Sequence, residues 1–593
     1  MKRHILFLLI SLVVLSSCED LFDPAIENLK DLDLMYDDPV FAQGVLTQSY
    51  RYLPNMYRRS SWATDDAVSN DRGSSWVKMN TGSWSASSNP VDMWVEGYGS
   101  IQYINTFLEK CDDIQWTTDP EAAELFNMRL KGEAYGLRGI FLYYLLRNHA
   151  GYGTNGELLG VPILTEFQDA HADFNVPRAT FQQCVDQILS DFDKALLNLP
   201  TNYNSVGDLS EVPDKYKDMV TLSSTYNRVM GDFAKQLVDG QIVMAYRSKV
   251  TLLAASPAFQ GGTNTTTWAD AAVYSSNALN IIGGLSGFDE DGDIYYKNTG
   301  AIDALANGNN FAEILWRENY STNAFGEERD NFPPSMHGNG RMNPTQNLVD
   351  AFPDVNGYPI TLSSDYSSED PFANRDPRLA QYILFNGGQI GSTTISTGSA
   401  SGTEDGINAL ETSTRTGYYM KKRLREDVLY DTQSTASNEN DKWQGKKNFK
   451  PRIRYTELFL NYAEAANEAY GPMGAAPGAD YSAYDIIKAI RARAGVGAGN
   501  GDAYLESIKG NQDEMRTLIR NERRLELCFE GFRFWDLRRW AADLTETAKG
   551  YDASTGEVFD VEARTYSDYM TYGPIPYSEI LKYDNLIQNR GWE

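Results

Sequence analysis

The sequence predicts a mostly helical protein built from helix pairs, with one long irregular insertion. Three observations lead to this prediction. Apolar residues recur every three or four positions over several long segments, as they do on the buried face of a helix. These segments lie before about residue 260 and after about residue 450, whereas the region between them is rich in Gly, Asn, Ser, Thr and Pro. A composition of 42% hydrophobic and 12% aromatic residues is sufficient to bury a large core.

The first eighteen residues predict an export signal followed by a lipidation site. Lys2 and Arg3 precede an apolar run, Ile5 to Leu15, that is too short to span a bilayer as a helix. The run ends in LSSC, a pattern typical of bacterial lipoproteins, so we expect cleavage before Cys18 and acylation of its thiol. An ordinary secretory signal with a chance cysteine is the alternative. No later apolar run approaches twenty residues, so we expect a tethered chain rather than one that crosses the membrane.

Several segments are predicted as helices with one apolar stripe. The longest begins at Asp119, an N-cap that is followed by a proline at the first helical position, and its stripe continues to Leu145. Further helices are predicted at residues 181–197, 236–256, 458–469 and 486–490, the last closed by Gly495 as a left-handed cap. Adjacent helices joined by short turns are typical of tetratricopeptide-like pairs, although no clean 34-residue period is present.

Residues 518–540, called the hub below, combine a helical pattern with many aromatic and charged side chains. Apolar residues follow spacings of seven, four and three until Gly531 interrupts the run. Arg523 with Glu526, and Glu530 with Arg533, are three residues apart, which predicts ion pairs on the helix surface. We interpret the hub as a packed structural element rather than a reaction centre.

The region from about residue 261 to residue 449 is predicted as a loop-rich insertion. Residues 391–416 are almost all small or polar, and residues 431–447 are polar and charged, as in surface loops. An insertion of this length is usually functional or disordered. We therefore expect a signal peptide at 1–17 and one domain at 18–593, with a helical scaffold at about 25–260 and 450–593.

Charge and motifs exclude several classes of function. The net charge of −28 opposes binding to nucleic acid and to polyanions over the whole surface, and fits a neutral ligand. The sequence holds four His and lacks H-E-x-x-H, G-x-S-x-G and Walker motifs, so we predict that the protein is not an enzyme. A surface glycoside hydrolase that uses two of the many carboxylates is the alternative. Cys111, Cys184 and Cys528 have no metal-ligand spacing, and the last two are predicted to be buried.

One acidic segment is a candidate metal site. Asp289, Asp291 and Asp293 alternate around Gly292, and oxygen ligands around a tight turn suit Ca²⁺. The spacing differs from that of an EF-hand loop, because position twelve is Gly300 rather than Glu. A solvated acidic turn is the alternative. No other cofactor is predicted.

Aromatic residues in polar sequence are the candidate ligand-binding residues. Trp62, Trp76 and Trp84 lie in sequence with no helical pattern before about residue 90, close to the polar residues Asp65 and Arg72. A Trp ring without a core partner exposes a large apolar surface, which points to a ligand. The C–H face of a sugar ring can stack on such a ring while its hydroxyls pair with polar neighbours. Replacing Trp76 or Trp84 by Ala should therefore weaken glycan binding and change stability little.

A second aromatic group consists of Tyr295, Tyr296 and Tyr320. The last of these lies in a loop rich in Ser and Asn. Core packing is the alternative for any single member, so the prediction concerns the group as a whole.

Several motifs, taken in their order along the chain, resemble those of the SusD/RagB family of Bacteroidetes outer-membrane lipoproteins. They are WVEGYGSIQYIN, GEAYGLRGIFLYYLL, NPTQNLVDAF, RDPRL, TGYYMKK, YTELFLNYAEAANEAYG, RARAG, the hub and the final GPIP segment. The resemblance implies a mostly α, SusD-like α-solenoid of four tetratricopeptide-like helix pairs, with the irregular part packed on it.

The resemblance also implies a function. A SusD-like protein is a non-catalytic lipoprotein, anchored in the outer membrane and facing outwards, that captures an oligosaccharide or polysaccharide and caps a SusC-like TonB-dependent transporter. Members of the RagB branch bind peptides instead, and a scaffold that binds only protein is a further alternative. The ligand-binding residues of the family vary with the ligand, so none is transferred to this chain. The sequence does not identify the glycan.

Overall fold

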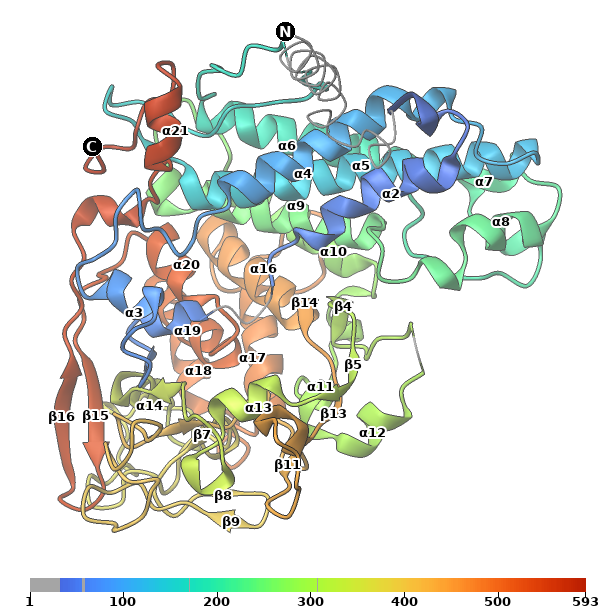
Figure 1. The fold of residues 1–593 in the computed structure, drawn as a ribbon. Coiled ribbons are helices and arrows are strands. Elements are labelled where there is room, and N and C mark those ends of the chain that lie inside the picture. Colours follow the sequence, from blue (N-terminus) through green and yellow to red (C-terminus); the bar gives the residue numbers. More distant parts are fainter. Residues whose placement is uncertain (1–31, 56–58, 170, 307) are drawn as a thin grey trace, which may run out of the picture.

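The computed structural model describes residues 32–55, 59–169, 171–306 and 308–593 (Figure 1). The predicted signal peptide and Cys18 lie outside these residues. None of the helices in the described part is long and apolar enough to cross a membrane. The three cysteines within it, Cys111, Cys184 and Cys528, are free and buried, and the burial predicted for the last two is confirmed.

The helical body is a chain of neighbouring helices, and the prediction of a mostly α fold is confirmed. Most helices pack on the next one along the body: α2 on α4, α4 on α5, α5 on α6, α6 on α9, α9 on α10, α10 on α16, and α16 on both α17 and α19. Their bounds are α2 Pro39–Arg51, α4 Trp94–Lys110, α5 Pro120–His149, α6 Phe181–Asn198, α9 Gly240–Ala255, α10 Trp268–Asn280, α16 Tyr455–Tyr470, α17 Ala483–Arg493 and α19 Gln512–Glu526.

Local signals explain where these helices begin and end. Asp119 caps α5 as predicted, since its side chain accepts hydrogen bonds from the first free backbone amides. Helix α9 begins later than its apolar pattern, because Asp239 caps it and Gln236 has a left-handed φ of 74°. Gly495 follows α17 with a φ of +80°, which confirms the predicted left-handed cap. Helix α10 continues the helical body beyond residue 260.

Short helices and strands that pair two at a time hold the loop-rich part and the connections around the helical body. The pairs are β2 Gly151–Tyr152 with β3 Leu158–Leu159, β1 Ala67–Val68 with β6 Asn343–Pro344, β4 Ile314–Arg317 with β14 Pro451–Arg454, β5 Ser321–Ala324 with β13 Lys446–Asn448, β7 Ile383–Leu384 with β10 Tyr419–Met420, β8 Gln389–Ile390 with β9 Thr393–Thr394, β11 Leu429–Tyr430 with β12 Trp443–Gln444, and β15 Ala548–Asp552 with β16 Glu557–Glu562. The short helices are α3 Ser75–Asn80, α7 Asp214–Lys217, α8 Ser223–Met230, α11 Ile294–Lys297, α12 Thr299–Ala304, α13 Gly326–Asn331, α14 Gln346–Ala351, α15 Arg378–Tyr382, α18 Ala503–Ile508, α20 Arg533–Arg539 and α21 Tyr577–Lys582. Because β1 pairs with β6, the segment before α4 is fixed to the loop-rich part.

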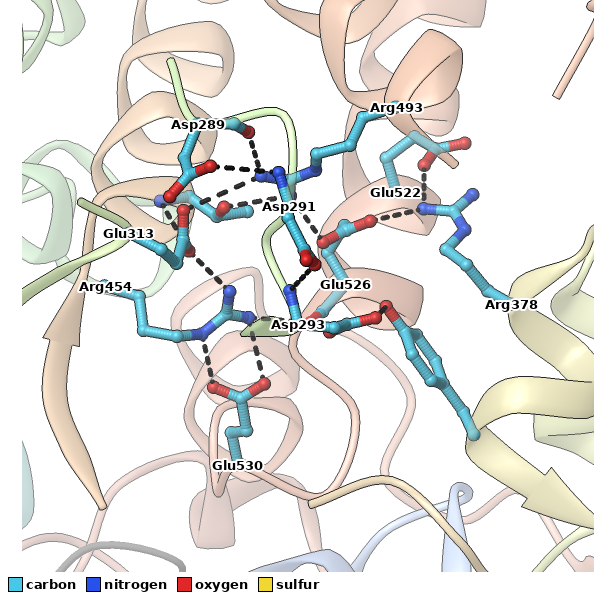
Figure 2. A network of polar contacts seen from close by, with 12 residues as sticks. Asp289, Asp291, Asp293, Glu313, Arg378, Arg454, Arg493, Glu522, Glu526 and Glu530 are labelled. Atoms are coloured by element: carbon cyan, nitrogen blue, oxygen red, sulfur yellow. Dashed lines mark hydrogen bonds and ion pairs between the residues drawn. The ribbon is translucent and has the colours of Figure 1, made fainter. Parts of the chain in front are cut away.

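The hub lies between the helical body and the loop-rich part, and its charges are buried. Gly531, with a φ of +86°, separates α19 from α20 as the sequence indicated. The predicted surface ion pairs, Arg523–Glu526 and Glu530–Arg533, do not form. Instead, Glu526, Glu530 and Arg533 pair with charged residues from distant segments, and Figure 2 shows part of this network. Arg523 pairs with Asp536 of the hub and donates to Asn461. A buried charge is tolerated only when several partners neutralise and hydrogen-bond it, which surface spacing cannot provide.

Candidate functional site

Two of the three tryptophans predicted to bind ligand are core residues. Trp62 is 2% exposed and Trp84 is 4% exposed. The ring of Trp84 lies 4.8 Å from that of Trp592, and its Nε1 donates to Asn89 at 3.0 Å. The prediction that these rings face solvent is wrong, because residues from the far end of the chain supply the apolar partners that the local sequence lacks.

The second aromatic group is also mostly buried. Tyr295 is 1% exposed and Tyr296 is 7% exposed, and their rings meet edge to face at 5.1 Å. Both belong to a small apolar cluster with Phe311 and Phe449, against which the half-buried Tyr320 packs. The alternative of core packing therefore holds for Tyr295 and Tyr296.

Asp65 is a structural residue rather than an exposed ligand contact. Its carboxylate is 5% exposed and accepts two hydrogen bonds from Arg533, at 2.9 and 2.7 Å. Burial raises the pKa of Asp65, but the charges of Arg524 and Arg533 outweigh burial and hold that pKa below its usual range. The carboxylate therefore stays ionised and ties the segment before α4 to the hub.

The predicted calcium ligands do not converge, as Figure 2 shows. The side chain of Asp289 accepts from the amide of Asp291 at 3.0 Å, and the side chain of Asp293 accepts from the hydroxyl of Tyr382 at 3.0 Å. Across the described ranges, no group of three or more His, Cys, Asp or Glu side chains could hold a metal ion. The calcium prediction is wrong, because these carboxylates satisfy the amides of their own turn and a neighbouring hydroxyl.

Three predicted residues keep surface available to a ligand: Arg72 is exposed, and Trp76 and Tyr320 are half-buried. They do not form one group. Trp76 lies in α3 and packs edge to face on Phe534 at 5.9 Å, whereas Tyr320 packs with Tyr295 and its neighbours.

A stacked pair that sequence reasoning missed lies on the loop-rich part. The rings of His337 and Tyr430 are 4.3 Å apart and inclined by 27°. His337 is exposed and has a left-handed φ of +64° at the end of a short turn, and Tyr430 ends β11. Beneath them, Tyr430 meets Trp443 edge to face at 5.3 Å, and Phe325 stacks on Trp443. The pair is thus the outer layer of an aromatic group whose inner members join the core.

Polar side chains surround this pair. The hydroxyl of Tyr430 donates to Glu439, which raises the pKa of Tyr430 and keeps the hydroxyl protonated. Lys442 donates to Glu439 at 2.7 Å, and Arg329 donates to Asn440 at 2.9 Å. We call His337 and Tyr430, together with Arg329, Glu439, Asn440 and Lys442, the loop-face site.

The segment that carries Arg72 is anchored beside the loop that contains His337. The side-chain amide of Asn70 donates to the carbonyls of Asn339 and Gly340 at 2.9 and 3.0 Å. Arg341 donates back to the side-chain oxygen of Asn70 at 3.1 Å. Arg72, two residues after Asn70, is exposed on this anchored segment. The only sequence signal for this site was the polar composition of residues 431–447. That composition does not predict which aromatic side chain would be exposed.

The comparisons with known proteins agree on one family. Residues 313–592 match a model described as the SusD family, and residues 35–232 match one described as starch-binding associating with outer membrane. SusD-like protein P38 of Formosa agariphila is 23% identical over 90% of this chain and 90% of its own length.

The solved structures confirm the fold. A SusD-like protein from Bacteroides fragilis has a TM-score of 0.69 at 22% identity, covering 96% of this chain and 99% of that chain. A second structure from the same species, described as a SusD-like carbohydrate-binding protein, has a TM-score of 0.66 at 19% identity and covers 93% and 99% of the two chains. The two matched regions, residues 35–232 and 313–592, together cover most of the chain, and the relative and the solved structures are SusD-like as well, so the chain belongs to the SusD/RagB family.

Proposed function

We propose that this protein is a non-catalytic cell-surface lipoprotein, anchored through Cys18, that captures an oligosaccharide and delivers it to a SusC-like TonB-dependent outer-membrane transporter. The observation that carries the proposal is the exposed stack of His337 on Tyr430, with its polar rim. The description of one similar structure as carbohydrate-binding and of one matched model as starch-binding supports a glycan as the ligand.

The loop-face site has the chemistry that a sugar ring requires. The outer ring of the pair provides an apolar plane for the C–H face of a pyranose. Glu439 and Asn440 can accept hydrogen bonds from hydroxyls, and Lys442 and Arg329 can donate to them. The rim carries charges of both signs, which fits a neutral glycan better than a polyanion.

Calorimetry on protein that starts after Cys18, titrated with a panel of neutral polysaccharides, tests the proposal. Stacking on an aromatic ring is worth about 1–3 kcal/mol, by analogy with base stacking. Tyr430→Ala and His337→Ala should therefore each weaken binding by about 5- to 150-fold. Tyr577→Ala is the matched control, because Tyr577 is 46% exposed on α21 and is not part of the site.

The other outcomes have clear meanings. Binding that is unchanged in both loop-face variants would show that the site lies elsewhere. A peptide that co-purifies, with no binding to any glycan, would favour the RagB-like alternative. Release of reducing sugar from a bound polysaccharide would favour the hydrolase.

Delivery to the transporter requires a second surface, which we assign to the helical body. Helix-pair solenoids present extended faces suited to protein partners. Co-purification with a SusC-like transporter from the same organism should survive Tyr430→Ala, while glycan binding falls. Loss of both functions would show that the two faces are misassigned. Cys18→Ala should abolish labelling by a palmitate analogue and release the protein from the membrane.

A further inference from the structure

A second cleft lies between the helical body and the hub, and it shares no residue with the loop-face site. Its volume is about 90 Å³. One water needs roughly 10–15 Å³ of such space, so the cleft can hold a ligand of several heavy atoms. Its walls are largely aromatic and aliphatic: Trp76, Tyr143, Tyr144, Leu252, Phe532 and Trp535.

Most charges on these walls are neutralised within the protein. Arg523 and Arg539 both donate to Asp536, at 2.8 and 2.9 Å. Glu530 accepts from Arg454 and Lys422 at 2.9 and 2.7 Å. These side chains therefore have little charge left to offer a ligand.

Arg147 is different, because its charge is held in place without an acidic partner. Its guanidinium lies over the ring of Trp535, 4.0 Å from the centroid, and its Nε donates to Asn148 at 3.1 Å. Its two terminal nitrogens have no hydrogen-bond partner in the part of the chain that the structure describes. Cation–π contacts fix a guanidinium and leave its outer N–H groups available to a planar anion.

Glu457, on the same cleft, has an unused acceptor. The residue is 2% exposed, and one of its carboxylate oxygens accepts from Lys249. The other oxygen, Oε2, is buried and has no hydrogen-bond partner among the described residues. A buried oxygen of this kind normally receives a donor. Because Lys249 already neutralises Glu457, a neutral hydroxyl suits this oxygen better than a second cation.

We infer that the cleft is a second binding site, for a hydroxylated carboxylate such as the uronic acid unit of an acidic glycan. The carboxylate binds the outer N–H groups of Arg147, and a hydroxyl donates to Oε2 of Glu457. The apolar walls limit access of water, which strengthens both contacts. The net charge of −28 does not oppose one bound carboxylate, since charges beyond about 8 Å are largely screened at physiological salt. The inference rests on the proposed function only in taking the ligand to be a sugar.

Calorimetry with three small probes tests the inference on the wild-type protein. Galacturonate carries both the carboxylate and the hydroxyls, galactose has the same ring without the carboxylate, and acetate has only the carboxylate. Galacturonate should bind at least about tenfold more tightly than either of the others. Equal affinity for galacturonate and galactose, or no binding of galacturonate, would overturn the inference.

Variants assign the contact to Arg147. A hydrogen bond to a charged group corresponds to about a 10- to 150-fold change in affinity, so Arg147→Gln should weaken galacturonate binding by that factor. Arg147→Lys keeps the positive charge but loses the planar guanidinium with its paired N–H donors, so it should give an intermediate affinity. The matched control Arg72→Gln should bind galacturonate normally. Arg147→Gln should lower the melting temperature only modestly, because it loses one side-chain hydrogen bond and the cation–π contact with Trp535 but no ion pair. Unchanged affinity in Arg147→Gln would overturn the assignment.

The loop-face variants separate this inference from the proposed function. Tyr430→Ala should lose affinity for neutral glycan and keep its affinity for galacturonate. If Tyr430→Ala loses galacturonate as well, the cleft is not an independent site. If galacturonate binds through Arg147 while no neutral glycan binds at all, the loop-face proposal fails and the cleft inference stands.

Discussion

Two polar segments rich in aromatic residues, residues 59–93 and the loops of the loop-face site, place their rings in opposite environments. In the first segment, Trp62 and Trp84 are buried beneath residues of the hub and the C-terminal segment. In the second, His337 is exposed and stacks on Tyr430, whose other side packs on the core. The polarity of neighbouring residues therefore indicates that a segment is a surface loop. It does not predict whether a particular aromatic ring in that loop is buried or exposed. That placement depends on partners that are distant in sequence.

The largest effect that tests this comparison is on stability. Trp84→Ala should cost about 3–5 kcal/mol of unfolding free energy, because it removes a ring that packs on Trp592 and Phe534. Tyr430→Ala should cost much less and should affect glycan affinity instead. Urea unfolding of the two variants measures the difference. Similar losses of stability in both would show that the two rings do not differ in environment as described.

The buried charges of the hub should make stability depend on pH at low pH. Burial raises the pKa of Glu526, but Arg493 and Arg378 outweigh burial and lower it to about 2. A lowered pKa stabilises the folded state above the ordinary value of 4.5, and this contribution disappears as the pH falls towards 2. The expected loss between pH 5 and pH 2 is on the order of 3 kcal/mol from this group.

Glu526→Gln is the matched variant for the pH dependence. It should cost about 3–5 kcal/mol at neutral pH, because it leaves buried guanidinium groups without their carboxylate. It should also flatten the fall in stability between pH 5 and pH 2, as measured by urea unfolding at a series of pH values. An unchanged slope would assign the acid sensitivity to other carboxylates.

A smaller effect distinguishes the ring of His337 from its backbone. A non-glycine residue at a φ of +64° is strained, so His337→Gly should be neutral or stabilise the fold by up to about 1 kcal/mol. The same variant should lose glycan affinity, since the outer ring of the stack is absent. His337→Asn, which also tolerates this backbone, is the control. Unchanged affinity in both variants would remove His337 from the site.

The smallest expected effect concerns calcium. Addition of excess calcium, or of a chelator, should leave the melting temperature unchanged, because the carboxylates of Asp289, Asp291 and Asp293 do not converge. A site filled at one hundred times its dissociation constant would stabilise the protein by about 2.7 kcal/mol. A clear upward shift in a thermal melt would therefore restore the calcium prediction.

The sequence predicted the helices better than it predicted the site, for a physical reason. Asp119 and Gly495 mark helix ends through contacts within a few residues, so their pattern is readable locally. The ion pairs of the hub could not be predicted, because Glu526 is paired with Arg378 and Arg493, which belong to other elements. The stack of His337 on Tyr430 joins two loops in the same way, and no spacing rule relates them.

The burial of Trp84 has a consequence for the order of folding. Its partners, Phe534 and Trp592, lie about 450 and 508 residues later in the chain, so this core forms only once these distant segments come together. Until then Trp84 lacks these partners, and the ion pair of Asp65 with Arg533 is also incomplete, although the strand β6 that pairs with β1 comes earlier in the chain. A chain cut before residue 534 would therefore leave Trp84 without these partners, which makes it a substrate for aggregation or proteolysis. Residues 59–93 therefore become part of the folded core only when Phe534 and Trp592 pack against Trp84.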